Sequence, residues 1–220
     1  MKQLFKCFYI LTFLITIVVA DSKENNRNIQ YMSSEIFYKE LYNLGVYWDR
    51  QILDIETNCQ SQYKVDPISF SIIKPIVFDN NQVHPIDGMW TFRFKFTRCN
   101  NFMIYNALII ARKDNLPKMV ALVPGNTNCS PQLISDLYRG ILVNLYAKYP
   151  SEKKCEREKF FDTQVTIAPK TVMEKGDEIN MWEEVWKIEY CGEKIDMNIC
   201  LLQTQKNVGT TWVIGKCKNN

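Results

Sequence analysis

Residues 90–97 alternate without a break between aromatic and polar side chains, and this segment constrains the fold most strongly. One side of the alternation is wholly aromatic: Trp90, Phe92, Phe94 and Phe96. The other side is polar: Thr91, Arg93, Lys95 and Thr97. Since successive side chains of a strand point to opposite faces, the pattern predicts a strand whose aromatic face is buried.

Further strand-like segments occur in two runs, and each run follows a helical pattern. Apolar residues at spacings of three and four predict helices over 33–56 and 131–148. Ser33 or Ser34 can cap the first helix, and Ser130-Pro131 opens the second. The predicted strands are 68–78, 90–97, 102–112 and 119–123, followed by 163–168, 182–190, 195–202 and 210–214. Residues 170–180 predict a polar loop.

Strands that cluster in runs, without a helix between successive strands, favour the α+β class. We expect a mainly antiparallel sheet with an N-terminal and a central amphipathic helix, reinforced by disulfides. Residues 33–217 then form a single α+β domain, for which 46% hydrophobic residues supply a core. No internal repeat stands out in the sequence.

The first twenty residues have the features of a cleavable signal peptide. Lys2 and Lys6 precede the uncharged run 7–20, which ends in Val18-Val19-Ala20. That run is shorter than the roughly 20 apolar residues of a membrane-spanning helix, so we expect cleavage after Ala20, with an uncleaved anchor as the alternative. The prediction is a periplasmic or secreted protein without stable membrane insertion, which begins with a flexible leader at 21–32.

Seven cysteines remain after cleavage, and an oxidising compartment favours their pairing. Because seven is odd, at least one thiol is free or bridges to another chain. A hairpin centred on Val208 and Gly209 would place Cys200 opposite Cys217, so we predict this disulfide. The pairing among the other cysteines stays open: Cys59, Cys99, Cys129, Cys155 and Cys191.

Charge and motif content narrow the classes of partner. The formal net charge of +3 falls by two once Lys2 and Lys6 are removed, and a nearly neutral domain argues against nucleic-acid binding. The sequence has no cluster with metal-ligand spacing and no glycine-rich phosphate loop. We therefore expect no metal and no cofactor, and we expect a protein as the partner, with the oligomeric state open.

Three residues are candidates for catalysis: Glu184, Asp162 and His84. Glu184 lies between two tryptophans on one face of a predicted strand, where apolar surroundings would raise the pKa of a carboxyl toward that of a general acid. Asp162 could supply the second carboxylate of a glycosidase-like pair, and His84 lies in a polar loop. In the structural alternative, Glu184 pairs with a basic residue of a neighbouring strand.

The chain also carries a set of short motifs after Trp90. They are Leu122-Val123-Pro124-Gly125-Asn126-Thr127 with Pro131 and Asp136, Trp182-Glu183-Glu184-Val185-Trp186, Cys191-Gly192, and Gly209-Thr210-Thr211. Together these motifs resemble a group of small exported proteins of Gram-negative bacteria with no characterised activity. The resemblance implies a periplasmic or secreted bacterial protein, and it brings no catalytic residue.

We therefore expect an exported non-catalytic binding or assembly protein of the bacterial cell envelope, or a secreted factor. One alternative is a secreted hydrolase that uses the carboxylates of Glu184 and Asp162. Another is a secreted toxin or inhibitor, which disulfides would permit.

Overall fold

The computed structural model describes residues 26–55, 63–99, 101–149, 157–174, 177–204 and 209–217. The expected signal peptide, residues 21–25 of the expected leader, Cys59 and Cys155 lie outside the described residues. Among the described residues, no helix is both long enough and apolar enough to cross a membrane.

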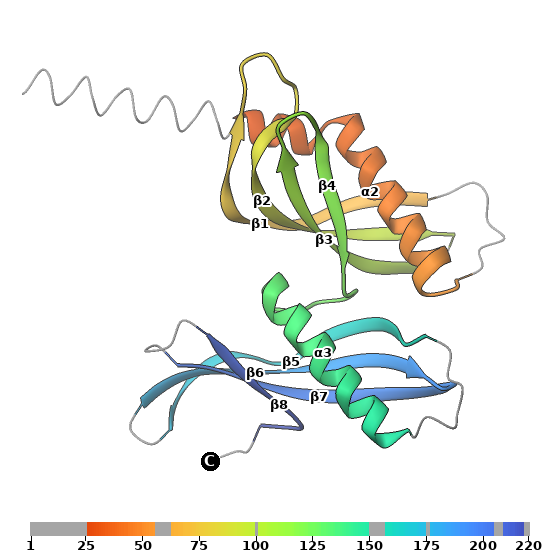
Figure 1. Ribbon diagram of the computed structural model, residues 1–220, viewed down its shortest axis with the longest axis vertical. Helices are drawn as coiled ribbons and strands as arrows, with labels where there is room; N and C mark the ends of the chain where they lie inside the picture. The colour runs from red at the N-terminus through yellow and green to blue at the C-terminus, as the bar shows by residue number, and fades with distance from the viewer. Residues whose placement is uncertain are drawn as a thin grey trace, which may run out of the picture.

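The chain folds into two units of the same architecture, each a helix followed by a four-stranded antiparallel meander. The first unit contains α2 (Glu35–Tyr47), the π-helix η1 (Trp48–Ile52), β1 (Tyr63–Phe78), β2 (Pro85–Arg98), β3 (Asn101–Arg112) and β4 (Asn115–Leu122). The second contains α3 (Pro131–Lys148), β5 (Lys159–Glu174), β6 (Asp177–Tyr190), β7 (Glu193–Thr204) and β8 (Thr210–Ile214). Figure 1 shows the two units one above the other along the long axis of the molecule.

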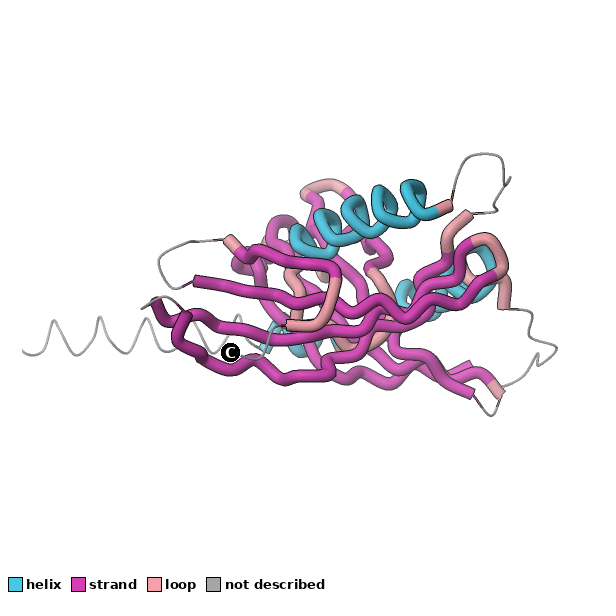
Figure 2. The backbone as a smooth tube through the Cα atoms, turned by 90° about the horizontal axis from the view of Figure 1, so that it is seen from below, coloured by secondary structure: helices cyan, strands magenta, loops and turns pink. Residues whose placement is uncertain are grey.

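This architecture confirms the expected α+β class, with the antiparallel strands in two sheets and a helix against each sheet. The repeat of helix and meander is a property of the structure, because no repeat is visible in the residues themselves. Figure 2, seen from below, shows the strands running side by side with the helices lying against them.

Both helices begin where capping residues predict. The Ser34 hydroxyl accepts a hydrogen bond from the Phe37 amide at 3.3 Å, and the Ser130 hydroxyl accepts one from the Leu133 amide at 3.3 Å. Such caps satisfy amides that have no partner inside the helix. Pro131 takes the first helical position, where its missing amide hydrogen costs nothing.

The core of the first unit lies between α2 and the aromatic face of β2, as the alternation at 90–97 predicts. Phe37 of α2 packs edge-to-face on Phe92 with ring centres 5.0 Å apart, and Trp90, Phe94 and Phe96 are fully buried. Gly45 permits a close approach of helix and sheet, since a Cβ there would lie 2.6 Å from the Phe96 ring.

The core of the second unit repeats this arrangement. Buried leucine and isoleucine residues of α3 pack over Trp186 and Ile199. Gly140 takes the place that Gly45 has in the first unit, because a Cβ at Gly140 would lie 2.0 Å from the Trp212 ring. A glycine in mid-helix lowers helix propensity, and here both such glycines give an aromatic ring of the sheet room to pack.

Two segments differ from the sequence-based expectation. Residues 26–32, assigned to a flexible leader, form a helix whose Tyr31 and Met32 are buried in the core of the first unit. The loop expected at 170–180 is mostly strand, because β5 continues to Glu174 and β6 starts at Asp177. Pairing across this long hairpin satisfies the backbone amides and carbonyls of a segment in which most side chains are polar.

The predicted disulfide between Cys200 and Cys217 is present, with Cα atoms 4.9 Å apart. The hairpin register from which this disulfide was predicted is not the one in the structure. Cys200 lies opposite Val213, not opposite Cys217, in the pairing of β7 with β8. The chain leaves β8 at Ile214, and the Cys217 amide then donates a 2.6 Å hydrogen bond to Glu183 beside Cys200. Cys99 and Cys191 are also disulfide-bonded, and Cys129 is a free, buried thiol.

Candidate functional site

Glu184 is the most buried carboxylate of the second sheet, and donors on the linker between the units surround it. We call residues 123–130, which join β4 to α3, the linker. The side chain of Glu184 is 0% exposed, and its Oε2 accepts from the Thr127 hydroxyl at 2.8 Å. Its Oε1 accepts from the Asn128 amide at 2.8 Å and lies 3.6 Å from the Cys129 sulfur.

The two tryptophans beside Glu184 complete this set of donors. Trp182 donates its indole N–H to Oε1 at 3.1 Å, and Trp186 donates to Oε2 at 3.0 Å. Among the described residues, no basic side chain forms an ion pair with Glu184. A buried carboxylate is therefore held by neutral donors, which offset the cost of removing it from water.

The first unit binds the same linker from the other side. Arg93 of β2 donates to the Thr127 carbonyl at 2.6 Å and to Asn106 of β3 at 2.8 Å. Asn106 in turn donates to the carbonyls of Val123 and Gly125 at 2.8 and 2.9 Å. Burial lowers the pKa of the Arg93 guanidinium, and the nearby Glu184 carboxylate opposes that shift.

Backbone contacts fix the linker against β5 as well. The Asn126 amide donates to the Thr163 carbonyl at 2.6 Å, and the Thr163 hydroxyl donates to the Pro124 carbonyl at 2.7 Å. Gly125 has a positive φ of 94°, and a Cβ there would lie 2.3 Å from the Thr163 amide nitrogen. The linker is thus held by both sheets, which sets the position of one unit relative to the other.

Cys129 is part of this network and is poorly suited to be a nucleophile. Burial, together with the Glu184 carboxylate, raises the pKa of its thiol well above the ordinary value. The reactive form of cysteine is the thiolate, and this site disfavours the thiolate strongly.

The structure does not bring the candidate catalytic residues together. Thr163 pairs with Trp186 and so shares the sheet face of Glu184. Its neighbour Asp162 therefore points to the opposite face, where it accepts a 2.6 Å hydrogen bond from Gln164. His84 lies between β1 and β2 in the other unit, with its Nδ1 3.3 Å from the Pro85 carbonyl oxygen.

A pocket of about 700 Å³ lies between the two units. One wall is formed by Leu44, Trp48 and Ile52 with the strand segment 118–122, and the other by α3 and Phe160. Figure 1 shows that the C-terminal end of α2 and the end of β4 face the second unit. Small-molecule sites have volumes of roughly 300–1,000 Å³ and often lie between domains, so this pocket is the candidate binding site.

The charged residues around the pocket are mostly basic. Lys118, Arg139 and Arg157 line it, and all three are exposed. None of the three has an ion pair or hydrogen bond within the described part of the chain. Glu158, the acidic residue of the lining, accepts a hydrogen bond from the Tyr138 hydroxyl. Burial and this bond raise the pKa of Tyr138, so Tyr138 stays neutral.

A buried cluster of charged and polar side chains lies behind the wall of the pocket that contains Trp48. Asp49 of η1 accepts a 2.5 Å hydrogen bond from Arg98 and another from the Tyr105 hydroxyl. The Trp48 ring stacks on the Tyr105 ring with centres 5.7 Å apart. Burial raises the pKa of Asp49 despite these partners. A π-helix departs from regular helix geometry and is frequent at functional sites, and here it turns Trp48 toward the pocket lining.

The sequence pattern identified Glu184 and its tryptophan neighbours. It did not identify Arg93 and Asn106, which bind the linker from the first unit. Arg93 belongs to the polar side of the alternating strand, which predicts a solvent-facing residue, whereas it lies under the linker. The pocket combines residues from α2, η1, β4, α3 and β5, which are far apart in the chain, so no local spacing could reveal it. Within the described residues, no group of three or more His, Cys, Asp or Glu side chains could hold a metal ion.

Comparison with known proteins found no relative: no protein-family model matches the chain, and neither curated proteins nor solved structures gave a match.

Proposed function

We propose that this chain is an exported, non-catalytic binding protein that holds a small amphipathic anion in the pocket between its two units. The observation that carries the proposal is an apolar pocket of about 700 Å³ with three basic side chains and one acidic side chain in its lining. A single-chain carboxylate of the fatty-acid class has the matching chemistry.

The apolar walls account for the body of such a ligand. Trp48 supplies a flat aromatic surface, and Ile134 and Phe160 line the opposite wall. Burial of an alkyl chain contributes roughly 0.8 kcal/mol per methylene. Such a ligand requires few polar contacts from the pocket, because a fatty acid accepts hydrogen bonds only at its carboxylate.

The basic residues account for the headgroup. Arg139 and Arg157 can each donate two parallel hydrogen bonds to a carboxylate, and neither is engaged by another described residue. With three basic side chains against the one carboxylate of Glu158, the lining of the pocket has an excess of positive charge. A cationic or neutral amphiphile would lack this contribution.

Disulfides support the exported location. Cys200–Cys217 and the disulfide-bonded Cys99 and Cys191 are typical of oxidising compartments, and the first twenty residues have the pattern of a signal peptide. Glu184 supports a binding role over hydrolysis, because a general acid must reach its substrate and this carboxylate is enclosed by the linker.

Isothermal titration calorimetry of the mature protein with dodecanoate, below its micelle concentration, tests the proposal. We expect saturable binding at one site with a negative heat-capacity change, as apolar burial requires. Dodecyltrimethylammonium has the same alkyl chain with the opposite charge, and it should bind at least about tenfold more weakly if the basic residues of the pocket lining recognise the headgroup.

Matched variants locate the site. The double variant Arg139→Gln/Arg157→Gln should weaken dodecanoate binding about tenfold, whereas Lys39→Gln removes an exposed charge of α2 outside the pocket and should bind like the wild type. Ser135→Trp fills the pocket from α3, and Asn144→Trp adds the same ring on the exposed side of that helix. Equal affinity for both headgroups, or unchanged binding in Ser135→Trp, would refute the proposal.

A further inference from the structure

A second cavity, of about 430 Å³, lies between the first sheet and the segment formed by the linker and the start of α3. We call this cavity the linker pocket. Residues 69–71 and 73 of β1 and 91–93 of β2 line it from the sheet, and residues 127–131 line it from the linker and α3. Its volume is within the range of roughly 300–1,000 Å³ that is typical of small-molecule sites.

Hydroxyl groups of two strands gather on the sheet side of the linker pocket. Phe92 faces α2, so its neighbours Thr91 and Arg93 point to the opposite face of the sheet. Ser69 lies opposite Arg93 and Ser71 lies opposite Thr91 in the pairing of β1 with β2, which places both serines on that face. The hydroxyls of these two serines and of Thr91 form no hydrogen bond with another described residue. They can therefore bind a ligand without breaking an existing contact.

Arg93 is the one charged residue among the described residues of this lining, and its guanidinium is held in position. Its Nε donates to Asn106 at 2.8 Å, and its Nη2 donates to the Thr127 carbonyl at 2.6 Å. These bonds leave Nη1 without a hydrogen-bond partner in the described part of the chain. A cation that is already oriented loses little freedom when it binds an anion.

No acidic side chain of the described lining competes for this guanidinium. Glu184 lies on the other side of Thr127, and its two oxygens accept hydrogen bonds from the linker and from the two neighbouring tryptophans. It forms no ion pair with Arg93. The linker pocket thus presents one positive charge and several free hydroxyls to a ligand.

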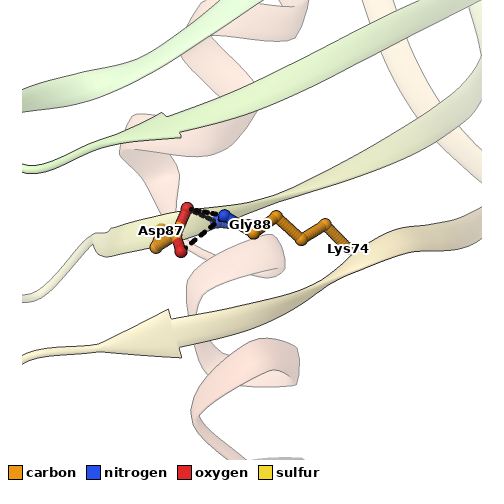
Figure 3. A network of polar contacts seen from close by, with 3 residues as sticks. All are labelled: Lys74, Asp87 and Gly88. Atoms are coloured by element: carbon orange, nitrogen blue, oxygen red, sulfur yellow. Dashed lines mark hydrogen bonds and ion pairs between the residues drawn. The ribbon is translucent and has the colours of Figure 1, made fainter.

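An ion pair helps to hold β1 beside the linker pocket. Lys74, which follows Ile73 of the lining, donates to both carboxylate oxygens of Asp87 in β2 at 2.7 Å, and the Gly88 amide donates to the same carboxylate at 2.8 Å (Figure 3). β1 is the outermost strand of its sheet and pairs with β2 alone. This contact ties β1 to β2 next to the serine hydroxyls, and it engages Lys74 outside the pocket.

We propose that the linker pocket binds a sugar acid, a hydroxylated ring that carries a single carboxylate. The Arg93 guanidinium donates from Nη1 to the carboxylate, a charge-assisted hydrogen bond. The hydroxyls of Ser69, Ser71 and Thr91 exchange hydrogen bonds with the ring hydroxyls, because each hydroxyl both donates and accepts. One arginine matches one negative charge, whereas a phosphate dianion or a tricarboxylate would bring charge that nothing in the described lining balances.

Isothermal titration calorimetry of the mature protein with glucuronate tests the proposal against two matched ligands. Glucose has the same ring without the carboxylate, and acetate has the carboxylate without the ring. We expect saturable binding of glucuronate, with both other ligands at least about tenfold weaker. Equal binding of glucose would remove the role of Arg93, equal binding of acetate would reduce the site to nonspecific anion binding, and no glucuronate binding would refute the site altogether. The titration does not depend on whether dodecanoate binds.

Matched variants place the sugar acid in the linker pocket. Thr91→Val removes a hydroxyl of the lining and should weaken glucuronate binding about three- to tenfold. Thr97→Val makes the same change on the same side of β2 outside the lining, and it should bind like the wild type. Circular dichroism establishes that both variants are folded. Equal affinity of the two variants for glucuronate, or displacement of bound dodecanoate by glucuronate, would overturn the proposal.

Discussion

Arg93 and Glu184, which belong to different sheets, both bind Thr127. Arg93 donates to the Thr127 carbonyl at 2.6 Å, and the Thr127 hydroxyl donates to Glu184 at 2.8 Å. One residue of the linker thus connects a half-buried cation of the first unit with a buried carboxylate of the second. The relative position of the units, and with it the shape of the pocket between them, depends on this connection.

Glu184→Gln should lower the free energy of unfolding by about 3 kcal/mol. Both carboxylate oxygens of Glu184 accept hydrogen bonds, and in glutamine an NH2 group, itself a donor, would replace one of these acceptors. Chemical denaturation measures this change. Glu189→Gln on the same strand, which is only half-buried, should change stability by less than about 0.5 kcal/mol. Hydrogen exchange gives a second readout, since the Asn128 amide should exchange faster in Glu184→Gln. Equal stability of the two variants would contradict the assigned role of Glu184.

Gly125→Ala should be much more destabilising than Gly192→Ala, although both glycines have positive φ angles of 94° and 76°. A Cβ at Gly125 would lie 2.3 Å from the Thr163 amide nitrogen, whereas a Cβ at Gly192 meets nothing within 4 Å. The backbone strain alone costs about 1–2 kcal/mol, and the clash should add at least about 2 kcal/mol. Thermal or chemical unfolding of both variants tests the difference. If both variants lose similar free energy of unfolding, the linker does not pack closely against β5 at Gly125.

Asp49→Asn should change how stability depends on pH. Burial holds the pKa of Asp49 above its ordinary value of 3.8 in the folded state, so the folded protein binds this proton more tightly than the unfolded chain. The contribution of Asp49 is then fully present below pH 3.8 and is lost as the pH rises through its folded pKa.

The free energy of unfolding of the wild type minus that of Asp49→Asn should therefore fall as the pH is raised from about 3 toward neutrality. Asp114→Asn, at an exposed turn position, is the matched control and should show no such fall. If the difference rises with pH instead, Arg98 and Tyr105 outweigh burial, and the direction assigned to Asp49 is wrong.

Cys129 should resist alkylation in the folded protein. Its side chain is buried and the pKa of its thiol is raised, so the thiolate population is small. An exposed thiol introduced by Asn126→Cys on the same linker should react with iodoacetamide at least about a hundredfold faster. Peptide mass spectrometry distinguishes the two sites, and rapid labelling of Cys129 would show that the linker opens readily.

The sequence predicted the local features well because each depends on neighbouring residues. The alternation at 90–97 identified β2 and its buried face, and the serine caps identified the starts of α2 and α3. The tryptophans beside Glu184 marked a carboxylate on a buried face. The pair Cys200–Cys217 was predicted from a hairpin register that the structure does not have, because the chain turns back after β8.

Features that depend on long-range packing were not predictable in this way. The helix at 26–32 is rich in polar residues, and the burial of Tyr31 and Met32 against the first sheet stabilises it. The contacts of Arg93 depend on the linker, which follows it by about thirty residues and approaches the sheet only in the folded chain. The pocket likewise exists only after two separately patterned units have packed together.

Photoaffinity labelling with a dodecanoate that carries a diazirine near its alkyl terminus tests the central claim most directly. The account predicts labels on residues 44–52, 118–122 and 134–139, which line the pocket from both units, and predicts that unlabelled dodecanoate removes them. Labels concentrated on residues outside the pocket lining, or labelling that excess dodecanoate does not reduce, would contradict a binding site between the units.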